Sequence, residues 1–156
     1  MRSQVYRAML VAFYLTAAGA SAHETPHHVI VKPDEIIWVD VPALPGAKMG
    51  IIEGPLDQAS PFTFRLKLPA NYDIPAHIHP VIERCTVLSG TFYMGSGSKF
   101  DKAKGDAIPA GGIAIIPAKT AHFAWTKEET IVQLNGTGPW GITFVDPYYD
   151  PKQAIK

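Results

Sequence analysis

The sequence predicts an all-β fold, either a closed barrel or a jelly roll, and three observations lead to that expectation. Short apolar or alternating runs follow one another along the chain. Turn residues separate these runs, and the chain has 13 glycines and 14 prolines among 156 residues. No stretch after Ala22 shows sustained helical periodicity. Many short strands spaced in this way are typical of β-barrels and jelly rolls.

The clearest strand pattern covers residues 62–68, where apolar and polar side chains alternate. Such alternation is typical of a half-buried antiparallel strand. We therefore expect Phe62, Phe64 and Leu66 to face the interior, and Arg65 and Lys67 to face solvent. The chain is expected to enter its first strand near Val29. Residues 95–104 are expected to form a polar loop, and Gly105-Asp106 a turn. The other strands are expected at 36–41, 49–53, 74–79, 84–88, 91–94, 113–116, 122–126, 131–134 and 142–145.

The N-terminal segment from Met1 to Ala22 has the pattern of a secretory signal peptide. Arg2 and Arg7 precede an apolar run, 8–18, and small residues follow at 18, 20 and 22. That run is too short to span a bilayer comfortably. We expect cleavage after Ala20 or Ala22 and a secreted or periplasmic protein with no membrane segment. The expected parts are a signal peptide (1–22), an N-terminal tail (23–34), one β-barrel domain (35–146) and a C-terminal tail (147–156).

Charge and cysteine content exclude several classes of protein. The whole chain has 14 basic and 14 acidic residues, and removal of Arg2 and Arg7 leaves 12 against 14, a net charge of −2. Nothing in this balance predicts a surface that binds polyanions, so nucleic acid is not an expected partner. The single cysteine, Cys85, cannot form a disulfide within the chain. The fold must therefore rest on its core.

The stretch from His77 to Gly90 has the composition of a metal site on a strand. In a strand, residues i and i+2 point to the same face, so His77 and His79 can direct two imidazoles at one point. Glu83 can supply a carboxylate oxygen to the same point. Apart from these two histidines, the predicted barrel domain (35–146) contains only His122, which is the first residue of another predicted strand.

These residues resemble the two sequence motifs of the cupin family. The first motif is a Gly, five residues, His-x-His, three or four residues, Glu, six residues and Gly. The second is Gly, five residues, Pro-x-Gly, two residues, His, three residues and Asn. The chain matches these motifs at His77, His79, Glu83, Gly90, Gly111, Pro117 and His122, and departs from them at Asn71 and Lys119, which replace glycines, and at Thr126, which replaces the final Asn.

The resemblance covers roughly residues 60–135 and implies a cupin-type jelly-roll barrel, a double-stranded β-helix. It also implies one divalent transition metal (Fe, Mn, Ni, Cu or Zn) bound by His77, His79, Glu83 and His122. In six-coordinate geometry two positions would stay open for a substrate and for water or dioxygen. A barrel that has lost its metal and keeps these side chains for packing is the alternative.

Two further residues are candidates for contact with this site. Cys85 lies two residues after Glu83, so its thiol can point into the same interior, where it would otherwise be a small buried apolar side chain. Gln133 on the predicted strand 131–134 is a candidate partner of a metal-bound group, against the alternative that it is an exposed polar residue.

The function expected from these observations is that of an exported mononuclear metal cupin. We expect a metal-dependent small-molecule enzyme of dioxygenase or oxidoreductase type, in which Glu83 is the one ligand that could also act in catalysis. Isomerase, hydrolase-like and decarboxylase reactions stay open. The alternative is a non-catalytic periplasmic module that binds a metal or a small ligand. A homodimer is expected only from the resemblance.

Overall fold

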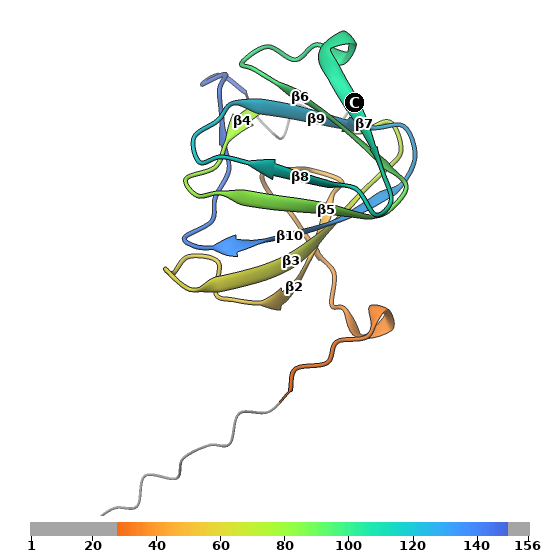
Figure 1. Cartoon of the computed structure of the whole chain (residues 1–156), viewed down its shortest axis with the longest axis vertical. Helices are drawn as coiled ribbons and strands as arrows, with labels where there is room; N and C mark the ends of the chain where they lie inside the picture. The colour runs from red at the N-terminus through yellow and green to blue at the C-terminus, as the bar shows by residue number, and fades with distance from the viewer. Residues whose placement is uncertain (1–27, 150–156) are drawn as a thin grey trace, which may run out of the picture. The chain divides into compact units, whose positions relative to one another are not determined.

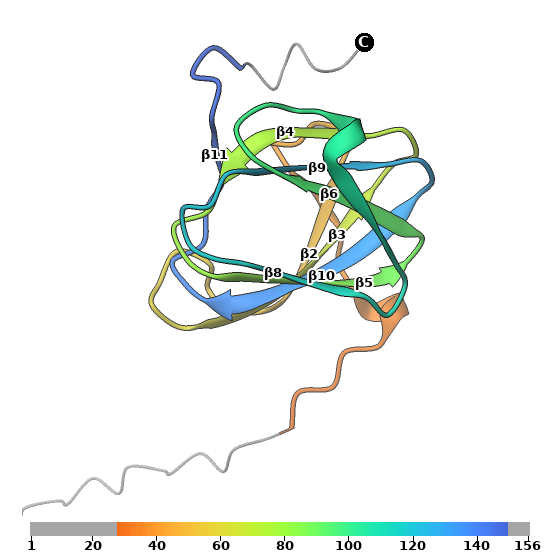
Figure 2. The same cartoon turned by 45° about the horizontal axis from the view of Figure 1, so that its top comes forward.

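The structure is a computed structural model that describes residues 28–149, so the predicted signal peptide and part of each predicted tail lie outside the described residues. Two antiparallel sheets face each other in the order β1-β2-β3-β10-β5-β8 and β11-β4-β9-β6-β7. Figure 1 shows the strands of both sheets, and Figure 2 shows how they curve around a common interior. Within the described residues, no helix is long and apolar enough to cross a membrane.

The elements follow one another with short connections, and only two three-residue 3-10 helices, η1 and η2, interrupt the strands of the described chain. Their bounds are η1 Pro33–Glu35, β1 Val39–Asp40, β2 Lys48–Glu53, β3 Pro61–Leu68, β4 Asp73–Ile78, β5 Glu83–Ser89, β6 Thr91–Ser96, η2 Lys102–Lys104, β7 Gly105–Pro109, β8 Ile113–Ile116, β9 His122–Thr126, β10 Thr130–Thr137 and β11 Thr143–Phe144.

Strand β3 confirms the predicted alternation. Phe62, Phe64 and Leu66 are at most 5% exposed and belong to the core between the sheets. The polar positions point to the outer face, as expected, but they are half-buried. There the Nε of Arg65 donates a hydrogen bond to Gln133 at 3.1 Å, and the Lys67 ammonium lies 4.6 Å from the centre of the Trp38 ring.

A second apolar layer lies on the opposite face of the five-stranded sheet. Phe123 and Trp125 of β9 are 0% and 3% exposed, although they point away from the main core. Their rings lie against Gly95 of β6 and Gly105 of β7, where a Cβ atom would collide with Phe123 and Trp125 respectively. Glycine at these two positions therefore makes room for the aromatic rings.

Three expectations about secondary structure were wrong. Residues 28–32 contain no strand near Val29, which is 80% exposed and has no strand partner that would order it. The strand expected at 36–41 is reduced to Val39–Asp40. Strand β7 was not predicted, because Gly105, Asp106 and Pro109 are rare in strands. β7 is an edge strand that pairs only with β6, where such residues are tolerated.

Candidate metal centre

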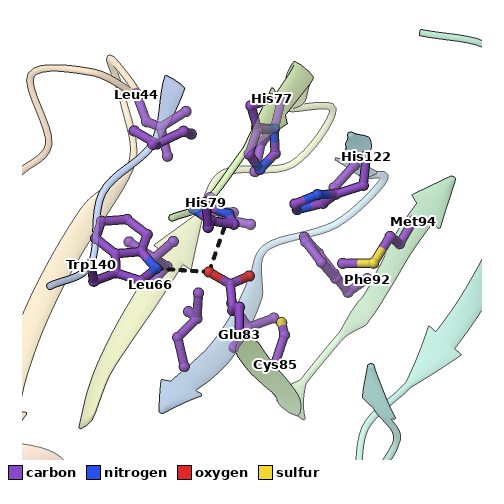
Figure 3. Close-up of a pocket in the computed structure, with 16 residues that line it drawn as sticks. Leu44, Leu66, His77, His79, Glu83, Cys85, Phe92, Met94, His122 and Trp140 are labelled. Atoms are coloured by element: carbon purple, nitrogen blue, oxygen red, sulfur yellow. Dashed lines mark hydrogen bonds and ion pairs between the residues drawn. The ribbon is translucent and has the colours of Figure 1, made fainter. Parts of the chain in front are cut away.

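Three strands bring the four predicted ligands to one end of the interior. His77 on β4 and His122 on β9 are directly opposite each other in the β4–β9 register. His79 follows the end of β4, and Glu83 is the first residue of β5. All four side chains are buried, at 3–5% exposure, and Figure 3 shows them converging on one pocket.

The three histidines are close enough to bind one ion. One ligand nitrogen from each of His77, His79 and His122 lies within 4.8 Å of the other two. The ring of His77 lies 4.2 Å from that of His122 and 4.9 Å from that of His79, measured between centroids. The structure thus brings together three buried imidazoles that could hold a metal ion.

Main-chain carbonyl groups select the tautomer of each imidazole. Nδ1 of His77 lies 2.7 Å from the Pro75 oxygen, Nδ1 of His79 lies 2.7 Å from the Gly141 oxygen, and Nδ1 of His122 lies 3.0 Å from the Thr120 oxygen. A carbonyl oxygen can only accept, so each Nδ1 must donate its hydrogen. Each neutral ring therefore keeps its lone pair on Nε2. Metal-binding histidines are commonly oriented in this way.

The fourth predicted ligand, Glu83, lies beside His79 but outside the group of three histidines whose ligand atoms all lie within 4.8 Å of one another. Its Oε2 accepts a hydrogen bond from Nε1 of Trp140 at 2.9 Å and lies 3.2 Å from Nε2 of His79. A carboxylate oxygen and a bare Nε2 would repel each other at this distance unless a proton or a cation lies between them. Two ligand atoms about 2.1 Å from one metal and at right angles would be about 3.0 Å apart. The donor set therefore fits a divalent transition metal.

Burial keeps the histidines neutral and opposes ionisation of the glutamate. Desolvation lowers the pKa of His77 to about 3, and the neighbouring His122 and His79 lower it further against the effect of the Pro75 carbonyl. Desolvation also lowers the pKa of His79 and of His122. It raises the pKa of Glu83 above its usual range, while the hydrogen bond from Trp140 and the proximity of His122 act in the opposite direction. Neutral imidazoles are the form that binds metals.

Apolar side chains form the rest of the cavity, whose volume is about 30 Å³. This is room for a bound ion and one or two water-sized groups. Apart from the four predicted ligands, the described side chains that line it carry no charge. The lining consists of Leu44, Leu66, Leu68, Ile74, Cys85, Phe92, Met94, Ala124, Val132, Leu134, Trp140 and Ile142 together with His77, His79, Glu83 and His122.

The four positions at which the two motifs place glycine share one backbone conformation. Gly90 and Gly111 have φ angles of 72° and 89°. Asn71 and Lys119, which replace the other two glycines, have φ angles of 56° and 60° and are the only non-glycine residues with positive φ in the described chain. Asparagine tolerates this left-handed conformation, whereas lysine adopts it at a cost. The departures from the motifs therefore keep the turn geometry.

Thr126, which replaces the final Asn of the second motif, has a structural role. Its hydroxyl donates to the Pro69 oxygen at 2.6 Å and accepts from the backbone nitrogen of Tyr72 at 3.1 Å. It therefore ties β9 to the turn that contains Asn71. This turn leads directly into β4, which carries His77, so Thr126 helps to place the first motif beside the second.

The two additional candidates have different outcomes. Cys85 lines the cavity with Glu83, as its position on the same strand face predicts. The residue is 2% exposed, and burial followed by the charge of Glu83 raises the pKa of its thiol, so it remains protonated. The assignment of Gln133 was wrong: it points to the outer face and binds Arg65, because Val132 and Leu134 occupy the inward positions of β10.

Two contributors to the site were missed. Trp140 binds Glu83, and the Gly141 carbonyl binds His79, although both lie in the irregular segment between β10 and β11. The segment Gly138-Pro139-Trp140-Gly141 belongs to neither motif. Without periodicity or fixed spacing to either motif, the segment did not predict a contact with Glu83 or His79.

Solved structures resemble the fold, while the chain matches no protein-family model and no curated protein sequence. A "putative acetylacetone dioxygenase" from Methylibium petroleiphilum PM1 has 21% identity and a TM-score of 0.61 over 81% of this chain and 87% of that one. The polyketide cyclase RemF from Streptomyces resistomycificus has 16% identity and a TM-score of 0.66 over 81% and 92%.

An RmlC-like cupin from Shewanella frigidimarina NCIMB 400 has 13% identity and a TM-score of 0.57 over 71% of this chain and 91% of that one. These likenesses concern the fold. The two facing antiparallel sheets and the paired motifs at one end of the interior agree with them. The chain therefore has the double-stranded β-helix fold of the cupin superfamily.

Proposed function

We propose that this protein is a mononuclear metal-dependent enzyme that acts on a small molecule, as an oxygenase or another oxidoreductase. The observation that carries the proposal is the convergence of three buried imidazoles, each with its lone pair on Nε2, with the carboxylate of Glu83 beside Nε2 of His79. A donor set of this kind suits Fe, Mn, Ni, Cu or Zn.

A divalent metal bound by His77, His79, Glu83 and His122 would supply Lewis acidity and a template for a substrate oxygen and, in an oxygenase, for dioxygen. The protein groups have narrower tasks. The carbonyl groups of Pro75, Gly141 and Thr120 hold the imidazole protons on Nδ1. Glu83, the one carboxyl group that lines the cavity, could also hold or release a proton. The apolar walls exclude water.

The lining also restricts the substrate. No lysine or arginine lines the described cavity, so a substrate carboxylate or phosphate would find no cationic side chain beside the metal. A compact, largely apolar compound with one or two oxygen donors fits this environment. A small diketone is one such compound. The similar fold described as a "putative acetylacetone dioxygenase" supports this choice only weakly, because another similar fold belongs to a polyketide cyclase.

The small volume of the cavity favours a second candidate, a non-catalytic module that binds the metal alone or with a very small ligand. A cavity of about 30 Å³ suits a bound ion with water or a very small ligand better than a larger substrate. Leu44, which lies on the connection between β1 and β2, and Trp140 form one side of the cavity (Figure 3).

One experiment distinguishes the enzyme from the binding module. The protein is purified without added metal, analysed by elemental mass spectrometry, and then tested for oxygen uptake with small diketones, phenols and carboxylates. Stoichiometric metal with oxygen uptake supports the enzyme. Stoichiometric metal without turnover across the panel favours the binding module. Traces of metal that reconstitution does not raise would contradict both, and His122→Ala serves as the metal-free control.

Export is part of the proposal and has a separate test. We propose that the protein is secreted or periplasmic because the segment from Met1 to Ala22 has the pattern of a signal peptide. After expression of the full chain in a Gram-negative host, N-terminal sequencing of the periplasmic fraction should begin at Ser21 or His23. A protein that keeps Met1 and stays in the cytoplasm would contradict export, whatever its metal content.

A further inference from the structure

A segment between β10 and β11, residues 138–142, crosses one side of the metal cavity and is named the strap. Trp140 and Ile142 line the cavity, and the Gly141 carbonyl accepts the Nδ1 hydrogen of His79. The strap therefore contacts two of the four donor residues, since Trp140 also binds Glu83. Neither cupin motif includes these positions.

The connection between β2 and β3 holds the strap in place. The backbone nitrogen of Trp140 donates to the Leu56 oxygen at 2.7 Å, and that of Gly138 donates to the Ser60 oxygen at 2.9 Å. A Cβ atom at Gly138 would collide with the Gln58 carbonyl, so only glycine permits this close approach. The position of Trp140 is thus set by main-chain contacts outside the metal site.

Packing also determines the orientation of the indole. Its ring stacks on His79, with centroids 5.2 Å apart and an angle of 24° between planes, and it contacts Phe64 edge-on at 4.8 Å. Nε1 consequently points at Oε2 of Glu83, 2.9 Å away, as the dashed line in Figure 3 shows. Among the described residues, two side chains contact the Glu83 carboxylate: His79, at 3.2 Å, and Trp140, which donates a hydrogen bond to it.

We propose that Trp140 is a positioning residue of the metal centre, which acts by holding the Glu83 carboxylate in the orientation that binds metal. The inference rests on the proposed metal binding. A buried carboxylate without a donor is poorly solvated and free to rotate away from the histidines. Loss of such an outer hydrogen bond typically weakens metal affinity about 10- to 100-fold.

The test compares Trp140→Phe with the wild-type protein after complete removal of metal. Phenylalanine keeps an aromatic ring beside His79 but lacks the N–H group. Zn²⁺ affinity is measured by competition with a chromophoric chelator, and the absorption spectrum of the Co²⁺ form reports the ligand geometry. We expect about 10- to 100-fold weaker Zn²⁺ binding and an altered Co²⁺ spectrum. Trp38→Phe is the matched control, because Trp38 lies beneath Lys67 on the outer face.

A double-mutant cycle separates this role from simple packing. If Trp140 acts through Glu83, Trp140→Phe should weaken Zn²⁺ binding in the wild-type background but have no further effect in a Glu83→Ala background. Equal losses in both backgrounds, or an unchanged affinity in the single variant, would overturn the inference. Failure of the wild-type protein itself to bind Zn²⁺ or Co²⁺ would instead overturn the proposed function.

A further measurement does not depend on the folding of the Trp140 variant. In a ¹⁵N-labelled wild-type protein, three indole N–H signals are expected, from Trp38, Trp125 and Trp140. Glu83→Ala should shift one of them strongly, and addition of Zn²⁺ to the wild-type protein should shift the same signal. If Glu83→Ala moves none of the three, the hydrogen bond is absent in solution and the inference fails.

Discussion

His77 and His122 lie directly opposite each other on β4 and β9, and their rings are 4.2 Å apart. One residue belongs to the first motif and the other to the second, so the pairing of these two strands joins the motifs into one site. The hydrogen bonds of the ladder, rather than a flexible loop, therefore set the distance between the two imidazoles. A metal centre built on paired strands is more precisely placed than one built on loops.

The first prediction concerns the metal ligands. We expect His79→Ala and His122→Ala each to abolish tight metal binding, because each removes one Nε2 donor from the cluster. The barrel should stay folded, since the strands keep their apolar core. Elemental analysis and circular dichroism measure the two effects. Gln133→Ala is the matched control, because Gln133 faces the outer side and binds Arg65; full metal in both histidine variants would show that the site is misplaced.

The second prediction is that metal stabilises the protein. A ligand that binds only the folded state at about 100 times its Kd adds about 2.7 kcal/mol to the free energy of unfolding. The thermal midpoint of the metal-free protein should therefore rise on addition of Zn²⁺ and fall again with a chelator. Scanning calorimetry measures the shift. His122→Ala should show little or no shift, and an equal shift in that variant would point to binding elsewhere on the chain.

The third prediction is that the metal-free protein loses stability in acid. The pKa values of His77, His79 and His122 lie below 6.5 in the folded state, so the unfolded chain binds more protons as the pH falls below 6.5. Their contribution to the free energy of unfolding is fully present above pH 6.5. It is lost as the pH falls toward the pKa values of the folded state, which is about 3 for His77.

Glu83 has the opposite effect on the free energy of unfolding between pH 4.5 and its raised pKa. In this range its carboxyl group is protonated in the folded state and ionised in the unfolded chain, so it adds stability as the pH falls. Below pH 4.5 the unfolded chain also protonates Glu83, so there the histidines act without its opposition. Urea unfolding of the metal-free protein from pH 7 to pH 4 measures this slope. His77→Gln should reduce it; an unchanged slope would mean that His77 is not buried in its neutral form.

The fourth prediction concerns the left-handed backbone at Lys119. Its side chain is exposed, and its backbone nitrogen donates to the His79 oxygen, a bond that any residue except proline keeps. Lys119→Gly should relieve the strain at φ 60° and raise stability by up to about 1 kcal/mol, after the greater freedom of glycine in the unfolded chain is taken into account. Asn71→Gly is the comparison and should gain less; urea unfolding measures both.

The fifth prediction concerns the glycines beneath the outer aromatic layer. Gly95→Ala and Gly105→Ala should each destabilise the protein by about 1–3 kcal/mol, because the added methyl group collides with Phe123 or Trp125. Gly141→Ala is the control for stability, since a Cβ atom there would meet nothing within 4 Å and the φ of Gly141 is not positive. Equal stability of all three variants would show that the aromatic rings can move aside.

The sequence predicted the elements whose signal is local. Alternation located β3 and its inward face, and motif spacing located the three histidines that the structure brings together. Local signals failed at β7, because its place at the edge of the sheet permits residues that are otherwise rare in strands. They also failed at Gln133, because Val132 and Leu134 already occupy the inward positions of β10. The contact between Trp140 and Glu83 depends on the loop that carries Leu56 and Ser60, and no pattern within the strap encodes it.

The acceptors that orient the three imidazoles are all main-chain atoms. No side-chain substitution at Pro75, Thr120 or Gly141 can delete a carbonyl group, so this part of the site is inherited with the strand and turn geometry rather than with residue identity. Substitutions at these three positions should therefore keep the acceptors in place as long as the backbone path is kept. A search for relatives of this centre should weigh the four predicted ligands and Trp140, and ignore which residues stand at positions 75, 120 and 141.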